Sequence, residues 1–483
     1  MGESNADIRW IGAYYHPGAN RNTAPEGVWV EITGKRPTIW RGETQLPLKD
    51  LNVKKLREVY PFLDMGMSDR AANQALMQQL ESELRARHVP IGYYFSETGS
   101  VNLPDGSLGF VRGDTFYSGD FDRPYLVAPG IGDIELCGDG STSAQYILMV
   151  LRTLPPQALL TIAYDALTSV RSLVIGCGVG LQTVLYITGK NGRGKSQLAK
   201  RTVLFCRSKK AGMPIGIVEA DSTNAATDHM LHILRDIPVV VEDLCLSTGR
   251  ETERKRREQG ARLVRKGTSE VPTVKKSGNK TIESYCNAGI VLTAEFTMET
   301  ESDLNRCLIV PITDYLDLPD GLTPQLISDA IRLFSTWFAN NGETELNRLK
   351  QELANGDWGR NQEHRVRTNY LCLRRAFQSL LTALDPNNLF PGDTCALSGQ
   401  MEKALAISLN AHTKIYCMNY RVGTIQQIVK QLQKEGYQVS EYALRRWIAE
   451  GVIPSVSSGK KKLIVFDHVV EYLTTGNVTP QSA

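Results

Sequence analysis

The spacing of hydrophobic and polar positions changes several times along the chain, and each change predicts a different kind of element. Residues 27–42 alternate apolar and polar side chains around Gly34 and Lys35, which is typical of a β-hairpin. Residues 68–88 carry apolar side chains at helical spacing behind Ser68, a favourable helix cap. Because strand and turn patterns surround this helix, we expect a β-rich N-terminal domain at residues 1–135.

The middle of the chain contains short runs in which nearly every side chain is apolar. These runs alternate with helical segments, an order typical of a parallel sheet with helices on both faces. We therefore predict an α/β domain at residues 136–319. The expected strands are residues 183–188, 214–221, 237–244, 287–296 and 306–312.

The pattern changes twice more towards the C-terminus. Residues 320–420 have helical spacing, interrupted by a segment rich in Pro, Gly and Asn at 384–393. Residues 421–483 contain two short helices, capped by Thr424 and Ser440, and then a glycine-centred hairpin. We expect a helical lid or linker followed by a small C-terminal domain.

The composition is that of a soluble globular protein. Of 483 residues, 42% are hydrophobic and 22% are charged, the net charge is +3, and the length requires several separate cores. The nine cysteines include no C-x-x-C pair, which argues against a zinc ribbon or a disulfide framework. With neither a secretion signal nor an apolar run long enough to span a membrane, we expect a cytoplasmic protein without a membrane partner.

Residues 189–196 read GKNGRGKS, the pattern G-x-x-x-x-G-K-S between a predicted strand and a predicted helix. In this pattern, backbone N–H groups of a glycine-rich loop surround a phosphate, the lysine reaches the outer phosphates and the serine hydroxyl binds Mg²⁺. A chance glycine turn is the alternative, but the strand, loop and helix occur in the required order. The sequence thus predicts an ATP and Mg²⁺ site made of Gly189, Lys190, Asn191, Gly192, Arg193, Gly194, Lys195 and Ser196.

Two adjacent carboxylates, Glu242 and Asp243, end the apolar run VVVED. At the carboxyl edge of a buried strand, one carboxylate can hold Mg²⁺ and the other can orient the attacking water. By position we assign Glu242, with Ser196, to the metal and Asp243 to the general base. Motor ATPases usually have Asp before Glu, so the reversed order leaves the two roles interchangeable, and an ordinary charged strand end is the alternative.

Two further polar residues lie at ends of the later strands. Thr293, followed by Glu295, stands where such ATPases keep a residue that senses the terminal phosphate. Arg306 is an isolated cation just before a buried strand and is suited to reach the phosphate of a neighbouring subunit. The alternative for Arg306 is a solvated residue at the edge of the sheet.

The segment at residues 250–280 is strongly basic, with eleven Lys or Arg and four Glu, an excess of seven positive charges. Such an excess is typical of a surface that binds the phosphate backbone of a nucleic acid. Its second half predicts a hairpin that carries Lys275, Lys276 and Lys280, which we expect to contact DNA. The alternative is a solvated helix followed by a loop.

The C-terminal pattern of helix, turn, helix and basic hairpin resembles a winged-helix or excisionase-like DNA-binding module. Arg445 and Arg446 on the second helix would enter a groove, and the hairpin would contact phosphates through Lys460, Lys461 and Lys462. A winged helix that docks on a protein is the alternative.

The segments GKNGRGKS, EADSTNAATDHMLHILRDIPVVVED, GIVLTAEF and LNRCLIV together resemble a family of ATPases from phages, plasmids and integrative elements. This family includes the replicative helicases of staphylococcal cassette chromosomes and is related to the ring-forming AAA+ helicases of the minichromosome-maintenance and viral superfamily-three types. The resemblance covers residues 141–314 and implies a P-loop AAA+ core with a winged helix after it.

What the resemblance implies in function is an ATP-driven DNA helicase or replication initiator of a mobile element, assembled as a homo-hexamer. Its DNA would be single-stranded or forked at the ATPase and duplex at the C-terminal domain. Two alternatives stay open: an origin-binding initiator that uses ATP only as an assembly switch, and a defence or signalling ATPase with a protein partner.

Overall fold

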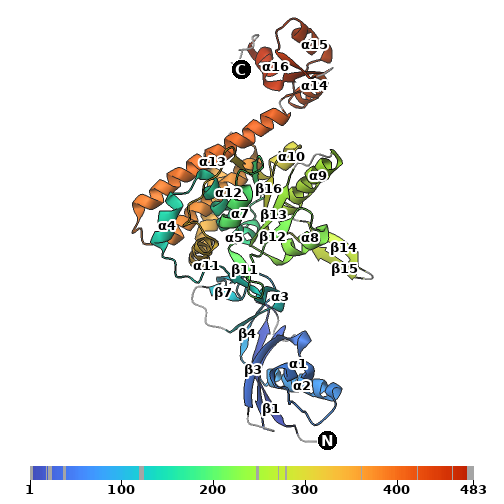
Figure 1. Ribbon diagram of the computed structural model, residues 1–483, viewed down its shortest axis with the longest axis vertical. Coiled ribbons are helices and arrows are strands. Elements are labelled where there is room, and N and C mark those ends of the chain that lie inside the picture. Colours follow the sequence, from blue (N-terminus) through green and yellow to red (C-terminus); the bar gives the residue numbers. More distant parts are fainter. Residues whose placement is uncertain are drawn as a thin grey trace.

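The molecule has three units that follow one another along its longest axis (Figure 1). An N-terminal unit lies at one end, a large central unit holds a parallel sheet, and a small C-terminal unit lies at the other end. The computed structural model describes residues 4–17, 19, 24–35, 40–86, 88–118, 124–245, 250–269, 271–277, 280–360, 362–420, 422–458 and 461–475.

The N-terminal unit is a five-stranded sheet, in the order β3-β2-β1-β4-β8, that packs against two helices. Val28, Val30 and Ile32 are fully buried at alternate positions of β2, because one face of the sheet forms the core with these helices. The elements are β1 (Ala6–Tyr15), β2 (Gly27–Gly34), β3 (Trp40–Pro47), the 3-10 helix η1 (Leu48–Asp50), α1 (Val53–Val59), α2 (Asp69–Arg85), β4 (Ile91–Phe95) and β8 (Tyr125–Val127).

The two elements predicted in this unit are present. β2 and β3 pair in antiparallel fashion, although residues 36–39 of their turn lie outside the described residues. The expected helix is α2, and the Ser68 side chain caps it by accepting a hydrogen bond from the Ala71 N–H.

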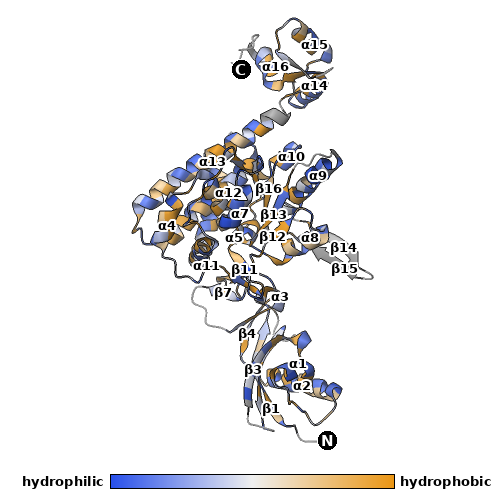
Figure 2. Cartoon of the chain, in the orientation of Figure 1, coloured by the Kyte–Doolittle hydropathy of each residue, from blue (hydrophilic) through white to orange (hydrophobic). Residues whose placement is uncertain are grey.

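The central unit is built on five strands that are parallel to one another, as predicted. Their order in the sheet is β12-β13-β16-β10-β17. All six residues of β16 are buried, and since successive side chains point to opposite faces, the sheet is covered on both sides. The strands are accordingly hydrophobic along most of their length (Figure 2). They are β10 (Val184–Gly189), β12 (Ile217–Glu219), β13 (Pro238–Leu244), β16 (Gly289–Ala294) and β17 (Cys307–Ile312).

Helices and a projecting hairpin connect these strands. The hairpin β14–β15 extends away from the body of the central unit (Figure 1). The connecting elements are α7 (Lys195–Thr202), α8 (Asn224–Ile233), α9 (Arg250–Gly267), β14 (Thr273–Ser277), β15 (Lys280–Ser284) and α10 (Glu301–Leu304); α5 (Pro156–Ser169) and α6 (Arg171–Gly176) precede β10.

Several strands that precede residue 136 share the core of the central unit. One hydrophobic cluster runs from Tyr93 to Leu405, and a separate cluster runs from Ala6 to Val89. The domain boundary predicted after residue 135 therefore falls inside the larger core. The elements concerned are β5 (Gly99–Asn102), β6 (Leu108–Arg112), β7 (Thr115–Ser118), α3 (Pro129–Gly132), β9 (Ile134–Leu136) with its partner β11 (Cys206–Ser208), and α4 (Ala144–Arg152).

A buried polar network attaches these early strands to the sheet. The Arg112 guanidinium is fully buried and donates to the carbonyl oxygens of Asp236 and Ser169 at 2.8 and 2.7 Å. The Asp236 carboxylate accepts from the backbone N–H groups of Ser100 and Ser172 at 2.8 and 2.9 Å, and from both hydroxyls. Burial lowers the pKa of Arg112, and the nearby Asp236 opposes that shift. One carboxylate thus joins β5, α6 and the start of β13.

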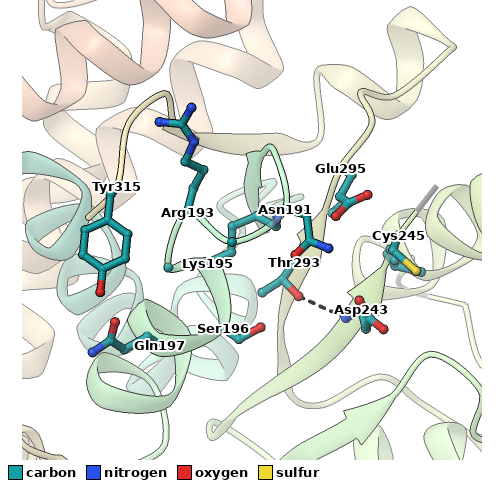
Figure 3. Close-up of a pocket in the computed structure, with 14 residues that line it drawn as sticks. Asn191, Arg193, Lys195, Ser196, Gln197, Asp243, Cys245, Thr293, Glu295 and Tyr315 are labelled. Carbon is teal, nitrogen blue, oxygen red and sulfur yellow. Dashed lines mark hydrogen bonds between the residues drawn. The ribbon is translucent and has the colours of Figure 1, made fainter. Parts of the chain in front are cut away.

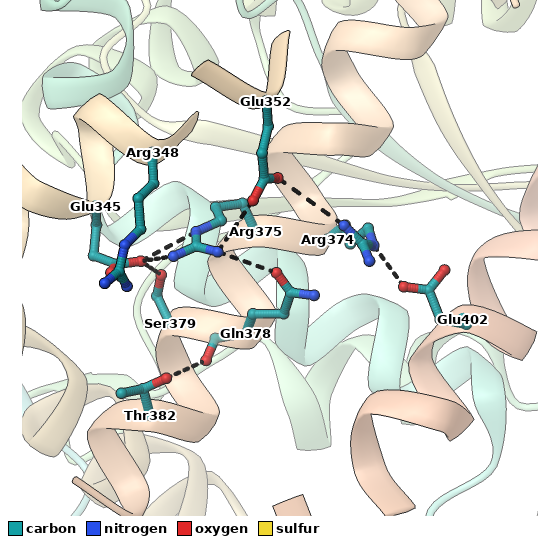
Figure 4. Close-up of polar contacts among 9 residues, drawn as sticks. All are labelled: Glu345, Arg348, Glu352, Arg374, Arg375, Gln378, Ser379, Thr382 and Glu402. Carbon is teal, nitrogen blue, oxygen red and sulfur yellow. Dashed lines mark hydrogen bonds and ion pairs between the residues drawn. The ribbon is translucent and has the colours of Figure 1, made fainter. Parts of the chain in front are cut away.

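Three long helices, α11 (Pro324–Asn355), α12 (His364–Leu384) and α13 (Pro391–Tyr420), form the predicted helical region. Arg–Glu contacts link them (Figure 4). The Glu345 carboxylate of α11, 5% exposed, accepts from Arg375 and Ser379 of α12 at 2.7 and 2.6 Å, while Arg374 pairs with Glu402 of α13 at 2.5 Å. The predicted Pro/Gly/Asn-rich break separates α12 from α13.

The C-terminal unit lies at the end of α13, which carries it away from the sheet (Figure 1). Two short helices precede an antiparallel pair of strands, and a separate small core holds the unit together. The elements are β18 (Val422–Thr424), α14 (Ile425–Lys434), α15 (Glu441–Ala449), β19 (Ser455–Ser458), β20 (Lys461–Val465) and α16 (Phe466–Thr475).

The first prediction concerns the Asp236 network. In Asp236→Asn, an NH₂ group replaces one of the two acceptor oxygens and faces a buried N–H group, so two donors oppose each other. We therefore expect the free energy of unfolding of the large core to fall by about 2 kcal/mol. Urea denaturation followed by circular dichroism measures this change. Asp357→Asn is the control, because that carboxylate is 89% exposed and pairs with the nearby Arg360. Equal urea midpoints for the two variants would contradict the structural role of Asp236.

Candidate functional site

The glycine-rich loop, predicted to bind phosphate and named the phosphate-binding loop below for that reason, lies between the end of β10 and the start of α7. Gly192 and Gly194 have φ values of 72° and 93°, a left-handed conformation that glycine adopts without strain. Gly189 has no room for a side chain, because a Cβ atom there would lie 2.3 Å from the Ile312 carbonyl oxygen of β17. Backbone conformation therefore explains Gly192 and Gly194, and a close backbone approach explains Gly189.

Lys195 is the first residue of α7, and its side chain folds back over the loop. Its Nζ donates to the carbonyl oxygens of Gly189 and Lys190 at 2.8 and 2.9 Å. Partial burial lowers the pKa of Lys195, while the nearby carboxylates of Glu295 and Asp243 oppose that shift. The ammonium group is thus held at the loop, next to the backbone N–H groups that would surround a phosphate.

A cavity of about 320 Å³ opens over this loop (Figure 3). Its wall combines the loop, the ends of β13 and β16, and the chain just beyond β17. Its lining residues are Asn191, Gly192, Arg193, Gly194, Lys195, Ser196, Gln197, Asp243, Leu244, Cys245, Thr293, Ala294, Glu295 and Tyr315.

The two predicted carboxylates of β13 have different surroundings. Asp243 is exposed and lines the cavity, whereas the Glu242 side chain is 12% exposed and pairs with Lys200 of α7 at 3.0 Å. The cause is a β-bulge: Val241 pairs with Leu292 but Leu244 pairs with Ala294, so one residue of β16 faces two of β13. The bulge directs one carboxylate into the cavity and leaves its neighbour against α7.

Thr293 stabilises this bulge. Asp243 has a φ of 67°, which is rare for a residue with a side chain, and its N–H donates to the Thr293 hydroxyl at 3.2 Å. Thr293 is 2% exposed and stands in the cavity wall, two residues before Glu295. Of the residues predicted for catalysis, the structure thus brings Lys195, Asp243 and Thr293 together.

The donor groups of the cavity fit a magnesium ion that is shared with a nucleotide. Within the described residues, no group of three or more His, Cys, Asp or Glu side chains could hold a metal ion by itself. Mg²⁺ at nucleotide sites needs only one or two protein oxygens, because phosphates and water supply the rest. The Ser196 hydroxyl and the Asp243 carboxylate are lining groups with oxygens of the kind that Mg²⁺ prefers. Glu242, whose Oε1 is buried without a hydrogen bond from the described residues, remains a predicted ligand.

Arg306 lies at the amino ends of the parallel strands, whereas the cavity of its own chain lies at their carboxyl ends. The Arg306 carbonyl oxygen accepts a hydrogen bond from the N–H of Val184, the first residue of β10. The glycine-rich loop follows the last residue of β10, and the two ends of this strand are roughly 16 Å apart. Partial burial and the nearby Arg365 lower the pKa of the Arg306 guanidinium, and Asp303 opposes them. In this position Arg306 is remote from its own loop, and its guanidinium donates to the Ser302 carbonyl oxygen.

The basic segment at residues 250–280 divides into a helix and a hairpin. Most cations of α9 pair with carboxylates, including Arg256 with Asp221 and Arg265 with Asp303. Arg262 and Lys266 both pair with the buried Asp228, at 2.7 and 2.9 Å. The charge excess counted along the sequence is therefore largely neutralised on α9.

The hairpin that was predicted to carry Lys275, Lys276 and Lys280 is present as β14 and β15. Ser277 pairs with Lys280, so these lysines occupy the strand positions nearest the turn. Residues 278 and 279 lie outside the described residues. The hairpin is thus the part of the basic segment that projects from the body of the protein (Figure 1).

The predicted C-terminal contacts lie on α15 and the following strands. The side chains of Arg445 and Arg446 are 61% and 62% exposed, and each pairs with a glutamate four residues away. Lys462 is exposed on β20, Lys461 is the first residue of that strand, and Lys460 lies outside the described residues. The arrangement leaves both arginines accessible on one helix.

Three cavity residues carry no motif that identifies them in the sequence. Gln197 follows Ser196 directly, Cys245 follows β13, and Tyr315 lies three residues beyond β17. An exposed tyrosine in a connecting segment has no periodicity around it, so only the folded chain reveals its place beside the loop.

Comparisons with known proteins locate the fold. No protein-family model matches the chain, and no curated protein matches it. A solved structure described as "SCCmec type IV Cch - active helicase" aligns with 96% of this chain and 94% of its own, at 14% sequence identity and a TM-score of 0.50. "The X-ray structure of JCV Helicase" aligns with 55% of this chain and 63% of its own, at 14% identity and a TM-score of 0.21, which is too low to support an argument.

None of the helices in the described part of the chain is both long enough and apolar enough to cross a membrane.

Over nearly its whole length, the chain has the fold of the first of these solved structures, an α/β architecture around a parallel sheet.

Proposed function

We propose that this chain is an ATP-dependent DNA helicase of a mobile genetic element, in which Mg-ATP hydrolysis in a ring of subunits drives unwinding. The observation that carries the proposal is the cavity at the carboxyl edge of the sheet, where Lys195, Ser196, Asp243 and Thr293 meet. The solved structure that shares the fold over 96% of this chain is described as an active helicase, which supports the choice of reaction.

In the proposed reaction, the loop N–H groups and the N-terminus of α7 surround the phosphates of ATP. Lys195 exchanges the carbonyl oxygens of Gly189 and Lys190 for phosphate oxygens, because both are acceptors for the same ammonium group. Ser196 and a carboxylate of β13 would hold Mg²⁺, which would neutralise charge on the phosphates. Asp243 orients the attacking water and accepts its proton, and Thr293 keeps Asp243 in place.

Coupling to DNA rests on two parts outside the cavity. The hairpin β14–β15 immediately precedes β16, whose other end carries Thr293, so this one strand connects the hairpin to the catalytic edge. We propose that its lysines hold one DNA strand through the phosphates, and that α15 contacts duplex DNA through Arg445 and Arg446. A homo-hexamer would bring Arg306 of one subunit to the cavity of the next, a role that is compatible with its distance from its own cavity.

Two other functions stay open. An origin-binding initiator would use the same cavity as an assembly switch, and a defence or signalling ATPase would use the hairpin to dock a protein. The α9 ion pairs limit the DNA-binding surface of the basic segment, because few cations of that helix remain for phosphates.

The second prediction tests the helicase itself. Lys195→Ala removes a direct phosphate contact, so ATP hydrolysis should fall about 100-fold or more, and displacement of a strand from forked DNA should be lost. The Lys275→Ala/Lys276→Ala variant should keep basal hydrolysis but lose stimulation by single-stranded DNA. Lys350→Ala, on the exposed surface of α11, is the control for both.

The outcomes separate the three functions. A wild-type protein that binds origin DNA but unwinds no fork would be an initiator. Hydrolysis that single-stranded DNA does not stimulate, with the hairpin variant equal to wild type, would indicate a protein partner.

The third prediction distinguishes the two carboxylates. Asp243→Asn removes the proposed base from the cavity, so kcat should fall roughly 10²- to 10⁴-fold while ATP affinity is retained. Glu242→Gln should instead raise the Mg²⁺ concentration required for half-maximal hydrolysis. Steady-state hydrolysis over a range of Mg²⁺ concentrations measures both. If Glu242→Gln abolishes kcat while Asp243→Asn does not, the roles are exchanged.

The fourth prediction tests whether Arg306 acts on a neighbouring subunit. Arg306→Ala and Lys195→Ala should each be inactive, but a mixture should regain part of the hydrolysis, because some interfaces then combine an intact loop with an intact arginine. The control is a mixture of Arg306→Ala with Arg85→Ala, a change to an 84% exposed side chain of α2. It shows how hydrolysis changes when Arg306→Ala is mixed with a protein whose own site is intact. No recovery above the sum of the two inactive variants would rule out a shared site.

A further inference from the structure

The cavity over the phosphate-binding loop has two chemically different ends. The sheet order places β16 and β13 on one side of β10 and β17 on the other. Asp243, Thr293 and Glu295 come from the first side, and Tyr315 comes from the second. Figure 3 shows Tyr315 and Gln197 on one side of Lys195, and Asp243, Glu295 and Cys245 on the other. The catalytic groups therefore occupy one end only.

Tyr315 is attached to the phosphate-binding loop by its neighbours. The Leu316 N–H donates to the Arg193 carbonyl oxygen at 3.2 Å, and Leu316 is 7% exposed. On the other side, Asp314 pairs with the Arg193 guanidinium at 3.6 Å. A Cβ atom at Gly194 would lie 3.4 Å from the Leu316 Cβ, so the two backbones are in contact. These contacts hold the backbone of Tyr315 at a constant place relative to the loop.

The tyrosine side chain, in contrast, is presented to the cavity. Tyr315 is 67% exposed, although Leu316 and Leu318 beside it are buried in the core. It is the one aromatic residue among those that line the cavity, and Gln197 of α7 is the adjacent polar side chain. An aromatic ring and an amide at the end opposite the catalytic carboxylates match the two needs of a nucleobase, which are a stacking face and a hydrogen-bonding partner.

We propose that Tyr315 forms the base-binding subsite of this cavity by stacking on the purine ring of the bound nucleotide, with Gln197 at its polar edge. The inference rests on the proposed nucleotide-dependent function and names a binding residue within it. If the loop binds the phosphates and the carboxylates face the terminal phosphate through Mg²⁺ and water, the base extends towards β17, where Tyr315 stands. Stacking depends on ring area, so a purine should bind more tightly than a pyrimidine.

The fifth prediction compares a nucleotide with a ligand that has no base. Binding of Mg-ATP, Mg-CTP and Mg-tripolyphosphate to the full-length protein is measured by calorimetry. Tyr315→Ala should weaken ATP binding roughly 5- to 100-fold, the range expected for loss of one stacked base. Tripolyphosphate binding should be unchanged, which also shows that the variant is folded. Tyr315→Phe keeps the ring and should match wild type within about two-fold.

The control variant is Phe62→Ala, which removes an aromatic ring that is 62% exposed in the N-terminal unit. It should bind all three ligands as wild type does. If Tyr315→Ala binds ATP like wild type, or weakens ATP and tripolyphosphate equally, the base subsite is wrong while nucleotide binding stands. If the wild-type protein binds neither ATP nor tripolyphosphate, the proposed function fails as well, so the two failures are distinguishable.

Discussion

Burial of the central sheet on both faces is the constraint on which the site depends. Every residue of β16 is buried, so polar groups can gather only where the strands end. All five strands are parallel and therefore end at the same edge. The loop after β10, the last residues of β13 and β16 and the segment after β17 consequently meet there, and the cavity is formed from four separate parts of the sequence.

The bulge between β13 and β16 refines this arrangement. On a regular strand, adjacent residues point to opposite faces, and the register alone would decide which carboxylate reaches the loop. Here the extra residue gives Asp243 a left-handed conformation, which aspartate tolerates better than most residues, and the buried hydroxyl of Thr293 accepts its N–H. Glu242 is left to pair with Lys200. Strain of this kind is typical of functional sites and is held by the surrounding structure.

Ion pairs neutralise most of the positive charge of α9 in the basic segment. Asp221, Asp228 and Asp303 come from outside the segment, and each pairs with at least one cation of α9. The buried Asp228 holds two cations and so attaches α9 to α8, a structural use of charge. The predicted DNA contacts are therefore concentrated on the hairpin and the C-terminal unit, which both project from the central body (Figure 1).

The sequence alone determined the features that depend on local spacing. The glycine-rich loop, the apolar strands, the capped helix α2 and the helical region before the C-terminal unit all follow from the side chains within a few positions of each other. Their outlines are present in the structure, and six of the residues predicted to bind phosphate, from Asn191 to Ser196, line the cavity. Local patterns also predicted the hairpin β14–β15, because strand-forming residues flank its turn.

Tertiary structure decided what depends on residues far apart in the chain. The large core takes in β5, β6 and β7, because the buried Arg112 and Asp236 join segments more than 100 residues apart, which no composition change marks. The choice of Asp243 over Glu242 for the cavity depends on a bulge against another strand. The position of Tyr315 beside the loop depends on the backbone hydrogen bond from the Leu316 N–H to the Arg193 carbonyl oxygen. Each is a long-range contact, and its energy comes from burial and pairing that only the folded chain provides.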